Sequence, residues 1–419
     1  MNSITILKGN VMFAPELGGL NCVENGYIVA EHGRIIDVFA ELPGKYAVAE
    51  IEDFGDALIT PAFVDMHLHA PQYSMVGLGM NLQLLDWLNT YTFKTESLYG
   101  DAGFAREAYG QLAAELISKG TTRVCMFSSL HRDSTLILME ELEKAGVTGY
   151  VGKVNMDRNS PAELSESTEQ SKAETLRWLE ECGRFKHIKP IITPRFTPSC
   201  TNELMEWLGK TAGVRDLRVQ SHLSENLAEM AWVRELHPDC ERYWQTYNKY
   251  GLWKHNTVMA HCVHCDAQER AAIKRAGVVV AHCPDSNLNL ISGIAPVRTM
   301  LREGIRVALG SDMAGGAMLS MTQTATMAIR VSKLRWYADH TEDFLTVAEA
   351  FYLITTAGQQ FFEAGPGFKP GDMLHAVVLS DKKLPKTRKL TNTERLERIV
   401  YLAQERDITA VYSEGRRVK

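Results

Sequence analysis

The chain has 419 residues, of which 45% are hydrophobic and 23% charged, an ordinary composition for a globular protein with a large core. Lysine and arginine number 45 against 51 aspartates and glutamates, so the formal net charge is −6. These values exclude a disordered or fibrous chain, and without a basic block we expect no nucleic-acid partner.

Three features of the sequence indicate where in the cell the protein is located. No apolar run reaches about 18 residues, so we expect no transmembrane helix and no membrane partner. The N-terminus lacks a basic stretch followed by an apolar one, so we expect no signal peptide. The eight cysteines are scattered, without the spacing of a small disulfide-linked domain, which favours free thiols and a cytoplasmic location.

The first part of the chain, residues 1–59, predicts short strands. Apolar pairs in Asn25–Leu42 flank Gly33, which is typical of two strands joined by a tight turn. After about residue 365 the pattern returns to strands. We therefore expect one small β-sandwich domain built from both termini, residues 1–59 and 366–419.

Residues 60–365 alternate short apolar runs with segments of helical periodicity, several of which end in glycine. The alternation occurs eight times, which is typical of a (β/α)8 barrel of the TIM type in the α/β class. The strand runs are ITPAFVDMHLH, TTRVCMFSSL, TGYVGKVNMD, IKPIITPRF, RVQSHLSE, TVMAHCVH, GVVVAHCPDSN and GIRVALGSDMAG. The first connection, residues 70–100, is too long for a plain loop, and long loops at this end of a barrel are usually functional.

His67 and His69 end the first predicted barrel strand. Alternate residues of a strand share a face, so we expect both imidazoles to point into the barrel as a pair of metal ligands. The same rule predicts the orientation of the rest of the strand: Phe63 and Asp65 inward, and the apolar Val64, Met66 and Leu68 outward.

Two further candidate ligands end other strands. His222 ends the fifth, and Asp312 ends the eighth, where Val307 and Leu309 are expected to face outward and Asp312 inward. Three imidazole nitrogens and one carboxylate suit Zn²⁺, with Fe²⁺ as second choice. Such an ion lowers the pKa of water, so the set predicts hydrolytic chemistry.

Glu225 and His261 are the candidates for handling protons and charge beside the metal. Glu225 follows His222 by three residues, where the strand has ended; the alternative is that it stabilises the first turn of a helix. His261 ends the sixth strand and could stabilise the attacking hydroxide, or could be a fourth imidazole ligand. Cys262 and Cys265 could form half of a structural zinc site, but no second pair accompanies them.

The motifs PAFVDMHLH, SHLSE, MAH and GSD together resemble those of the amidohydrolase superfamily. Within it, the chain from about Pro61 to Met321 is similar to the guanine deaminase family. The motifs that carry this resemblance are HAPQY, LLDWLNTYTFKTE, GKVNMDRN, PRF, SHLSEN, AHCPDSNLNL and LGSDMAGG.

The resemblance implies a role for each matching residue. One zinc ion per subunit would be held by His67, His69, His222 and Asp312. Glu225 would be the general acid and base, with His261 and Asp312 holding the attacking group. The purine would contact Gln72, Arg195, Phe196 and His222; an arginine fork suits the O6/N7 edge of guanine, and a phenyl ring can stack on a base.

Two-metal relatives carry a modified lysine where this chain has Thr193-Pro194-Arg195, so the resemblance implies a single metal. It also implies a homodimer and a small-molecule purine substrate, with guanine converted to xanthine and ammonia. Two alternatives stay open: a deaminase of another aminated heterocycle, such as 8-oxoguanine, ammeline or an adenosine derivative, and an inactive barrel used for assembly.

Overall fold

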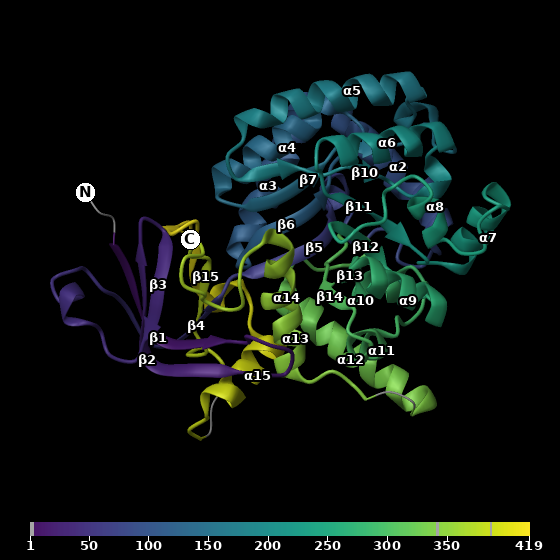
Figure 1. Cartoon of the computed structure of the whole chain (residues 1–419). Helices are drawn as coiled ribbons and strands as arrows, with labels where there is room; N and C mark the ends of the chain where they lie inside the picture. The colour runs from purple at the N-terminus through teal and green to yellow at the C-terminus, as the bar shows by residue number, and fades with distance from the viewer. Residues whose placement is uncertain (1–3, 341–342, 386–387) are drawn as a thin grey trace.

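A computed structural model describes residues 4–340, 343–385 and 388–419. It places a barrel of strands surrounded by helices beside a smaller β-rich part to which both ends of the chain contribute (Figure 1). Among the described residues, no helix is both long enough and apolar enough to span a bilayer.

The β-rich part is a seven-stranded sheet in the order β17-β16-β15-β4-β1-β2-β3. Its two halves join where β15 pairs antiparallel with β4. The expected sandwich is therefore one continuous sheet, and residues from β1 to β4, β15 and β16 share one apolar core. The strands are β1 (Ile4–Phe13), β2 (Asn21–Glu31), β3 (Arg34–Phe39), β4 (Glu52–Pro61), β15 (Ala376–Leu379), β16 (Ile408–Ser413) and β17 (Arg416–Arg417).

The barrel consists of two four-stranded parallel ladders, β5-β6-β7-β9 and β11-β12-β13-β14. A bridge between Ile192 and Val219 joins them on one side, and the N–H of Asp312 donates to the carbonyl of His67 at 2.8 Å on the other. The eight-stranded barrel is thus confirmed. Its strands are β5 (Phe63–His69), β6 (Thr121–Phe127), β7 (Thr148–Gly152), β8 (Val154–Asn155), β9 (Ile188–Pro190), β10 (Thr193–Pro194), β11 (Val219–Leu223), β12 (Thr257–His261), β13 (Val279–His282) and β14 (Arg306–Leu309), of which β8 and β10 are short extensions.

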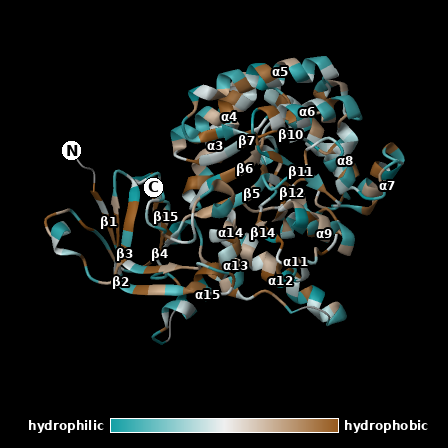
Figure 2. Cartoon of the chain, in the orientation of Figure 1, coloured by the Kyte–Doolittle hydropathy of each residue, from teal (hydrophilic) through white to brown (hydrophobic). Residues whose placement is uncertain are grey.

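Helices between the strands cover the barrel, and Figure 2 shows hydrophobic and hydrophilic residues alternating along them, as one-sided burial requires. Gly146 and Gly277 adopt positive φ at the ends of α4 and α9, as expected for helix-ending glycines. The helices are α3 (Ala102–Ser118), α4 (Arg132–Ala145), α5 (Thr168–Glu181), α6 (Asn202–Val214), α7 (Leu227–Leu236), α8 (Trp244–Asn248), α9 (Ala267–Ala276), α10 (Pro284–Asn289), α11 (Val297–Arg302), α12 (Met321–Asp339), α13 (Val347–Ile354) and α14 (Thr356–Gln359).

The long first connection folds into short helical turns over the carboxyl end of the barrel: η2 (Ala70–Met75), α1 (Leu84–Trp87), η3 (Leu88–Thr92), α2 (Phe93–Ser97) and η4 (Leu98–Gly100). The remaining short turns are η1 (Gly44–Tyr46), η5 (Ala162–Leu164), η6 (Cys182–Arg184), η7 (Thr197–Ser199), η8 (Gln360–Phe362) and η9 (Glu405–Asp407). One further helix, α15 (Asn392–Leu402), lies in the C-terminal part, where only strands were expected.

The predicted orientation of β5 is wrong for its first residues. Val64 and Met66 belong to a buried cluster with residues from β6, β7, β12, β13 and β14, so they fill the barrel interior rather than facing the helices. Phe63 packs in the outer core instead. The alternation between inward and outward side chains is interrupted between Asp65 and Leu68, where the pairing of β5 with β6 shifts register. The Asp65 carboxylate accepts the N–H of His67 at this point, which supports the irregularity.

Candidate active site

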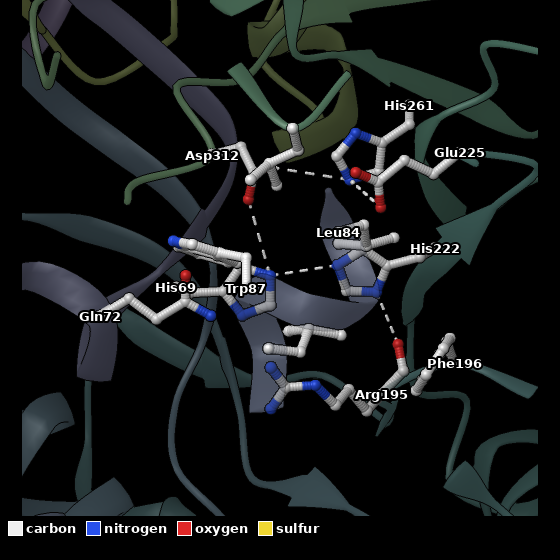
Figure 3. Close-up of a pocket in the computed structure, with 12 residues that line it drawn as sticks. His69, Gln72, Leu84, Trp87, Arg195, Phe196, His222, Glu225, His261 and Asp312 are labelled. Atoms are coloured by element: carbon white, nitrogen blue, oxygen red, sulfur yellow. Dashed lines mark hydrogen bonds and ion pairs between the residues drawn. The ribbon is translucent and has the colours of Figure 1, made fainter. Parts of the chain in front are cut away.

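Three imidazoles converge at the carboxyl end of the barrel. His67 and His69 come from the end of β5 and His222 from β11, and all three are buried. The Nε2 atoms of His69 and His222 are 3.1 Å apart, and one nitrogen from each imidazole lies within 4.8 Å of the other two. Figure 3 shows His69 and His222 pointing toward one another beside Asp312.

The hydrogen bonds of these imidazoles leave nitrogen lone pairs that face the space between the three rings. The Nδ1 of His222 lies 2.6 Å from the carbonyl oxygen of Arg195; since a carbonyl only accepts, Nδ1 carries the proton and Nε2 is a free acceptor. The Nε2 of His67 is buried and makes no hydrogen bond of good geometry with a described residue, although the carboxylate of Asp312 lies beside it. An orphaned buried nitrogen beside free lone pairs is the pattern of a ligand set.

Asp312 completes the cluster from the end of β14. Its Oδ1 lies 3.2 Å from Nε2 of His67 and 3.6 Å from Nε2 of His69. Its backbone has a φ of +46°, which turns the carboxylate inward. Burial opposes ionisation of Asp312, but His67, His261 and His69 around it hold the pKa of the carboxyl well below its usual value.

These four residues fit one divalent metal ion. In a tetrahedral zinc site with bonds of about 2.1 Å, ligand atoms lie about 3.4 Å apart, close to the spacings here. Burial and then the neighbouring His67 lower the pKa of His69 and His222 well below that of free histidine. Both imidazoles are therefore neutral, as metal ligands must be. The thiol of Cys283 also lies within 4.8 Å of ligand atoms of Asp312 and His67, which the sequence did not indicate.

Glu225 and His261 lie side by side next to this cluster. The Oε2 of Glu225 is 3.4 Å from Nε2 of His261, which is itself 3.7 Å from Oδ2 of Asp312. Burial, followed by the charge of Asp312, raises the pKa of Glu225 to about 8, although the hydroxyl of Ser292 donates to it. The other ring nitrogen of His261, Nδ1, lies 2.8 Å from Oδ1 of Asn287.

The alternative role for Glu225, support of a helix start, belongs to another residue. Asn226 caps α7, and Glu229 completes its capping box by accepting the N–H groups of Glu225 and Asn226. The side chain of Glu225 instead lines the pocket. A ring nitrogen of His261 also lies within 4.8 Å of ligand atoms of His67 and Asp312, so this imidazole borders the ligand set.

A pocket opens beside the cluster, with one apolar and one polar wall. The long first connection supplies Leu84, Trp87 and Leu88 to the apolar wall. The structure brings the predicted purine-binding residues to the same pocket. Its lining residues are His69, Gln72, Leu84, Trp87, Leu88, Arg195, Phe196, His222, Glu225, His261, Leu290 and Asp312.

Glu96 orients the polar wall, although it was not among the site residues predicted from the sequence. Its carboxylate receives both arms of the Arg195 guanidinium, at 2.5 and 3.0 Å, and the amide N–H of Gln72 at 2.9 Å. The Gln72 carbonyl accepts the N–H of Ala314 at 3.3 Å. Glu96 is 2% exposed and sits on α2, within the segment LLDWLNTYTFKTE. The sequence places Glu96 in the long first connection, but no local pattern indicates that its side chain faces the pocket.

The chain matches the model of the amidohydrolase family over residues 58–418. A crystal structure of guanine deaminase from C. acetobutylicum, with guanine bound in its active site, is 42% identical, covers 100% of both chains and superposes with a TM-score of 0.97. The guanine deaminase of Dictyostelium discoideum is 33% identical over 442 residues, covering 99% of this chain and 98% of that protein. The rat guanine deaminase is 37% identical over 373 residues, covering 85% and 82%.

Proposed function

The chain belongs to the amidohydrolase family, and we propose that it hydrolyses guanine to xanthine and ammonia. The observation that carries this proposal is the 42% identity and full-length superposition with an enzyme that holds guanine in its active site. The convergence of Gln72, Arg195 and Glu225 on one pocket beside a metal-binding cluster supports it independently.

His67, His69, His222 and Asp312 would hold the metal, with zinc preferred to iron because of the three imidazoles. When bound, the ion supplies Lewis acidity that activates water for attack at neutral pH. The protein keeps the imidazoles neutral by burial and fixes the His222 ring through the carbonyl of Arg195.

Glu225 is the proton carrier in this proposal. It accepts a proton from the attacking water and passes it to a ring nitrogen of guanine. It then takes the proton of the hydroxyl added at C2 and passes it to the amine, so that the C2–N bond breaks, ammonia leaves and the C2 carbonyl forms. A carboxyl with a pKa near neutrality can perform both transfers at pH 7, whereas a solvent-exposed glutamate would hold protons poorly. His261 and Asp312 face Glu225 and orient the attacking water toward C2.

Arg195, Gln72 and Phe196 would position the base. Two arms of the Arg195 guanidinium bind Glu96, and its remaining N–H groups can donate to the O6/N7 edge of guanine. The Gln72 amide can both donate and accept, and the ring of Phe196 can stack on the purine. With the ring fixed, the attacked carbon is held at the activated water.

Ammonia release from a substrate panel tests the proposal. We expect metal-replete protein to turn over guanine with a kcat/KM at least about tenfold above that for 8-oxoguanine, ammeline and adenosine, because a lost hydrogen-bonding partner costs about 1.4 kcal/mol or more. Faster turnover of another substrate would reassign the specificity. No turnover of guanine, on protein with a full metal complement, would overturn the function.

A homodimer and a cytoplasmic location complete the proposal. All eight cysteines are free thiols, which suits a reducing compartment. α12 exposes Leu334 at 53% and Tyr337 at 76%, an apolar surface that a second copy could cover. Light scattering would detect the dimer as a doubled mass, and cell fractionation would test the compartment; a monomer or a secreted protein would contradict these two points.

A further inference from the structure

A second cavity, of about 290 Å³, lies at the opposite end of the barrel from the active-site pocket. Arg123 and Thr148 line it from the amino-terminal ends of β6 and β7, and the terminal sheet domain closes it through Arg34 and Glu414. This basal cavity therefore lies between the barrel and the β-rich part, and no residue of the proposed reaction reaches it.

Arg123 is the unusual group in the basal cavity. It is the third residue of β6 and is 7% exposed, yet its guanidinium makes no hydrogen bond or ion pair with a residue that the structure describes. Burial lowers the pKa of its guanidinium to about 10, although Glu414 and Asp372 oppose this. A buried cation without a partner is costly, so a site that retains one is suited to an anion.

The carboxylates near Arg123 already have other partners. Glu414 accepts the Nε2–H of His375 at 2.9 Å, and Glu363 pairs with Arg218 at 2.6 Å. Asp372 accepts a backbone N–H at 2.7 Å. Each acidic side chain that lines the cavity is thus engaged, and within the described parts of the chain none lies at ion-pair distance from Arg123.

Three further cations surround the cavity. Lys186 precedes β9 and Lys189 lies within it, and neither ammonium forms an ion pair within the described parts of the chain. Among the residues that the structure describes, the Arg34 guanidinium donates only to the carbonyl of Gly371, at 2.9 Å. Four lysine and arginine side chains therefore face this space without a carboxylate partner of their own.

We propose that the basal cavity binds a small phosphate-bearing anion, with Arg123 as its central partner. A guanidinium presents a planar fork of N–H groups that matches two phosphate oxygens, and flanking lysines add charge. The volume lies at the lower end of the range for ligand pockets, about 300–1,000 Å³, which suits inorganic phosphate or a nucleoside monophosphate. This site is independent of the proposed deamination.

Calorimetric titration of the metal-replete protein at fixed ionic strength tests the proposal. Inorganic phosphate is titrated in one arm and a nucleoside 5′-monophosphate in the other, which identifies the source of the phosphate group. We expect one site per chain in at least one arm. The Arg123→Met variant should raise the Kd about tenfold or more, since a charge-assisted hydrogen bond is worth about 1.5–3 kcal/mol.

A second variant keeps the test valid if Arg123→Met does not fold. Lys186→Gln combined with Lys189→Gln changes exposed side chains and should weaken binding severalfold, while Lys210→Gln, on the exposed face of α6, should not. All three variants should deaminate guanine within about twofold of wild type. Binding that is absent, equally weakened by Lys210→Gln, unchanged in both cavity variants, or abolished by guanine would overturn the proposal.

Discussion

Glu225 combines burial with two immediate neighbours, His261 and Ser292, that can exchange or share its proton. A buried carboxyl beside the negative charge of Asp312 resists ionisation, which is why its pKa rises to about 8. The side chain of Glu225 does not cap α7, because Asn226 and Glu229 form the capping box of that helix. At the scale of single residues, this is the side chain on which the proposed proton transfers depend most.

Replacing Glu225 with glutamine tests that role. The change keeps the shape of the side chain but removes the exchangeable proton, so kcat for guanine should fall about 10²- to 10⁴-fold with metal content unchanged. Steady-state ammonia release and elemental analysis measure both quantities. Glu235→Gln, the same change on the exposed face of α7, is the control and should retain full activity. A Glu225→Gln enzyme within a few-fold of wild type would refute the proton-carrier role.

Glu96 should act on substrate binding rather than on the chemical step. In Glu96→Gln the Arg195 guanidinium loses its charged partner and the Gln72 amide loses a charged acceptor. We expect KM for guanine to rise about tenfold or more, because hydrogen bonds to charged groups contribute about 1.5–3 kcal/mol, with a smaller fall in kcat. Glu107→Gln, exposed on α3, is the matched control. An unchanged KM would show that Glu96 does not position the pocket.

Some residues of the site could be predicted from the sequence and others could not. His67, His69, His222 and Asp312 could be predicted to meet, because each ends a parallel strand and the carboxyl ends of such strands form one rim. Glu96 could not, since the path of the insertion that carries it depends on tertiary packing rather than on periodicity.

At the scale of elements, β5 shows where a simple rule failed. Strict alternation predicted Val64 and Met66 on the helix side, but both lie in the barrel interior. The reason is local: Asp65 binds the N–H groups of His67 and Ser311 and the hydroxyl of Ser311, which ties β5 to the start of the Asp312 loop and breaks the alternation. After this break in the alternation of β5, the side chains of His67 and His69 both face the barrel interior.

Asp65→Ala should therefore damage both the strand and the metal site. It leaves buried N–H groups unsatisfied, so we expect the free energy of unfolding to fall by about 2–4 kcal/mol and metal affinity to weaken. Denaturant titration and competition with a chelator measure the two effects. Asp239→Ala, which breaks an exposed pair with Lys249, should cost less than about 1 kcal/mol. Equal losses in the two variants would contradict this account of β5.

The helix α15 was missed although its signals are local. Thr391 and Glu394 form a capping box, and Leu396, Ile399 and Val400 are buried at helical spacing. No helix was predicted for residues 392–402, which lie between two segments that predict strands. Periodicity over 11 residues should have prevailed over the composition of the neighbouring segments.

At the scale of the whole molecule, the alternation of strand and helix was enough to predict the barrel, because it repeats along more than half of the chain. The sheet order of the terminal domain was not predictable, since β4 and β15 pair across the entire barrel sequence. His375 marks this junction: its ring lies 2.9 Å from the Thr122 hydroxyl of β6 and 2.9 Å from the Glu414 carboxylate.

The junction should make stability depend on pH. Burial, and then the charge of Arg123, lowers the pKa of His375 to about 4, against 6.5 in the unfolded chain. Between these values the unfolded state binds more protons, so the free energy of unfolding rises with pH across this window and falls on acidification. The lowered pKa of His375 makes the free energy of unfolding larger above pH 6.5 than below pH 4, by an amount on the order of 3 kcal/mol.

Urea unfolding at pH 7.0, 5.5 and 4.5 checks this linkage. The difference in unfolding free energy between wild type and His375→Asn should shrink as the pH falls, because asparagine does not titrate. Parallel pH profiles for wild type and His375→Asn would show that the junction does not contribute.

The dependence of guanine turnover on metal content is the decisive measurement for the proposed metal-dependent deamination. Metal-depleted protein is titrated with Zn²⁺ while ammonia release from guanine is measured. We expect activity that is close to zero without metal, rises in proportion to added Zn²⁺ and reaches a plateau at one equivalent per chain. Full turnover of guanine in the metal-depleted protein, or none at any metal content, would contradict it.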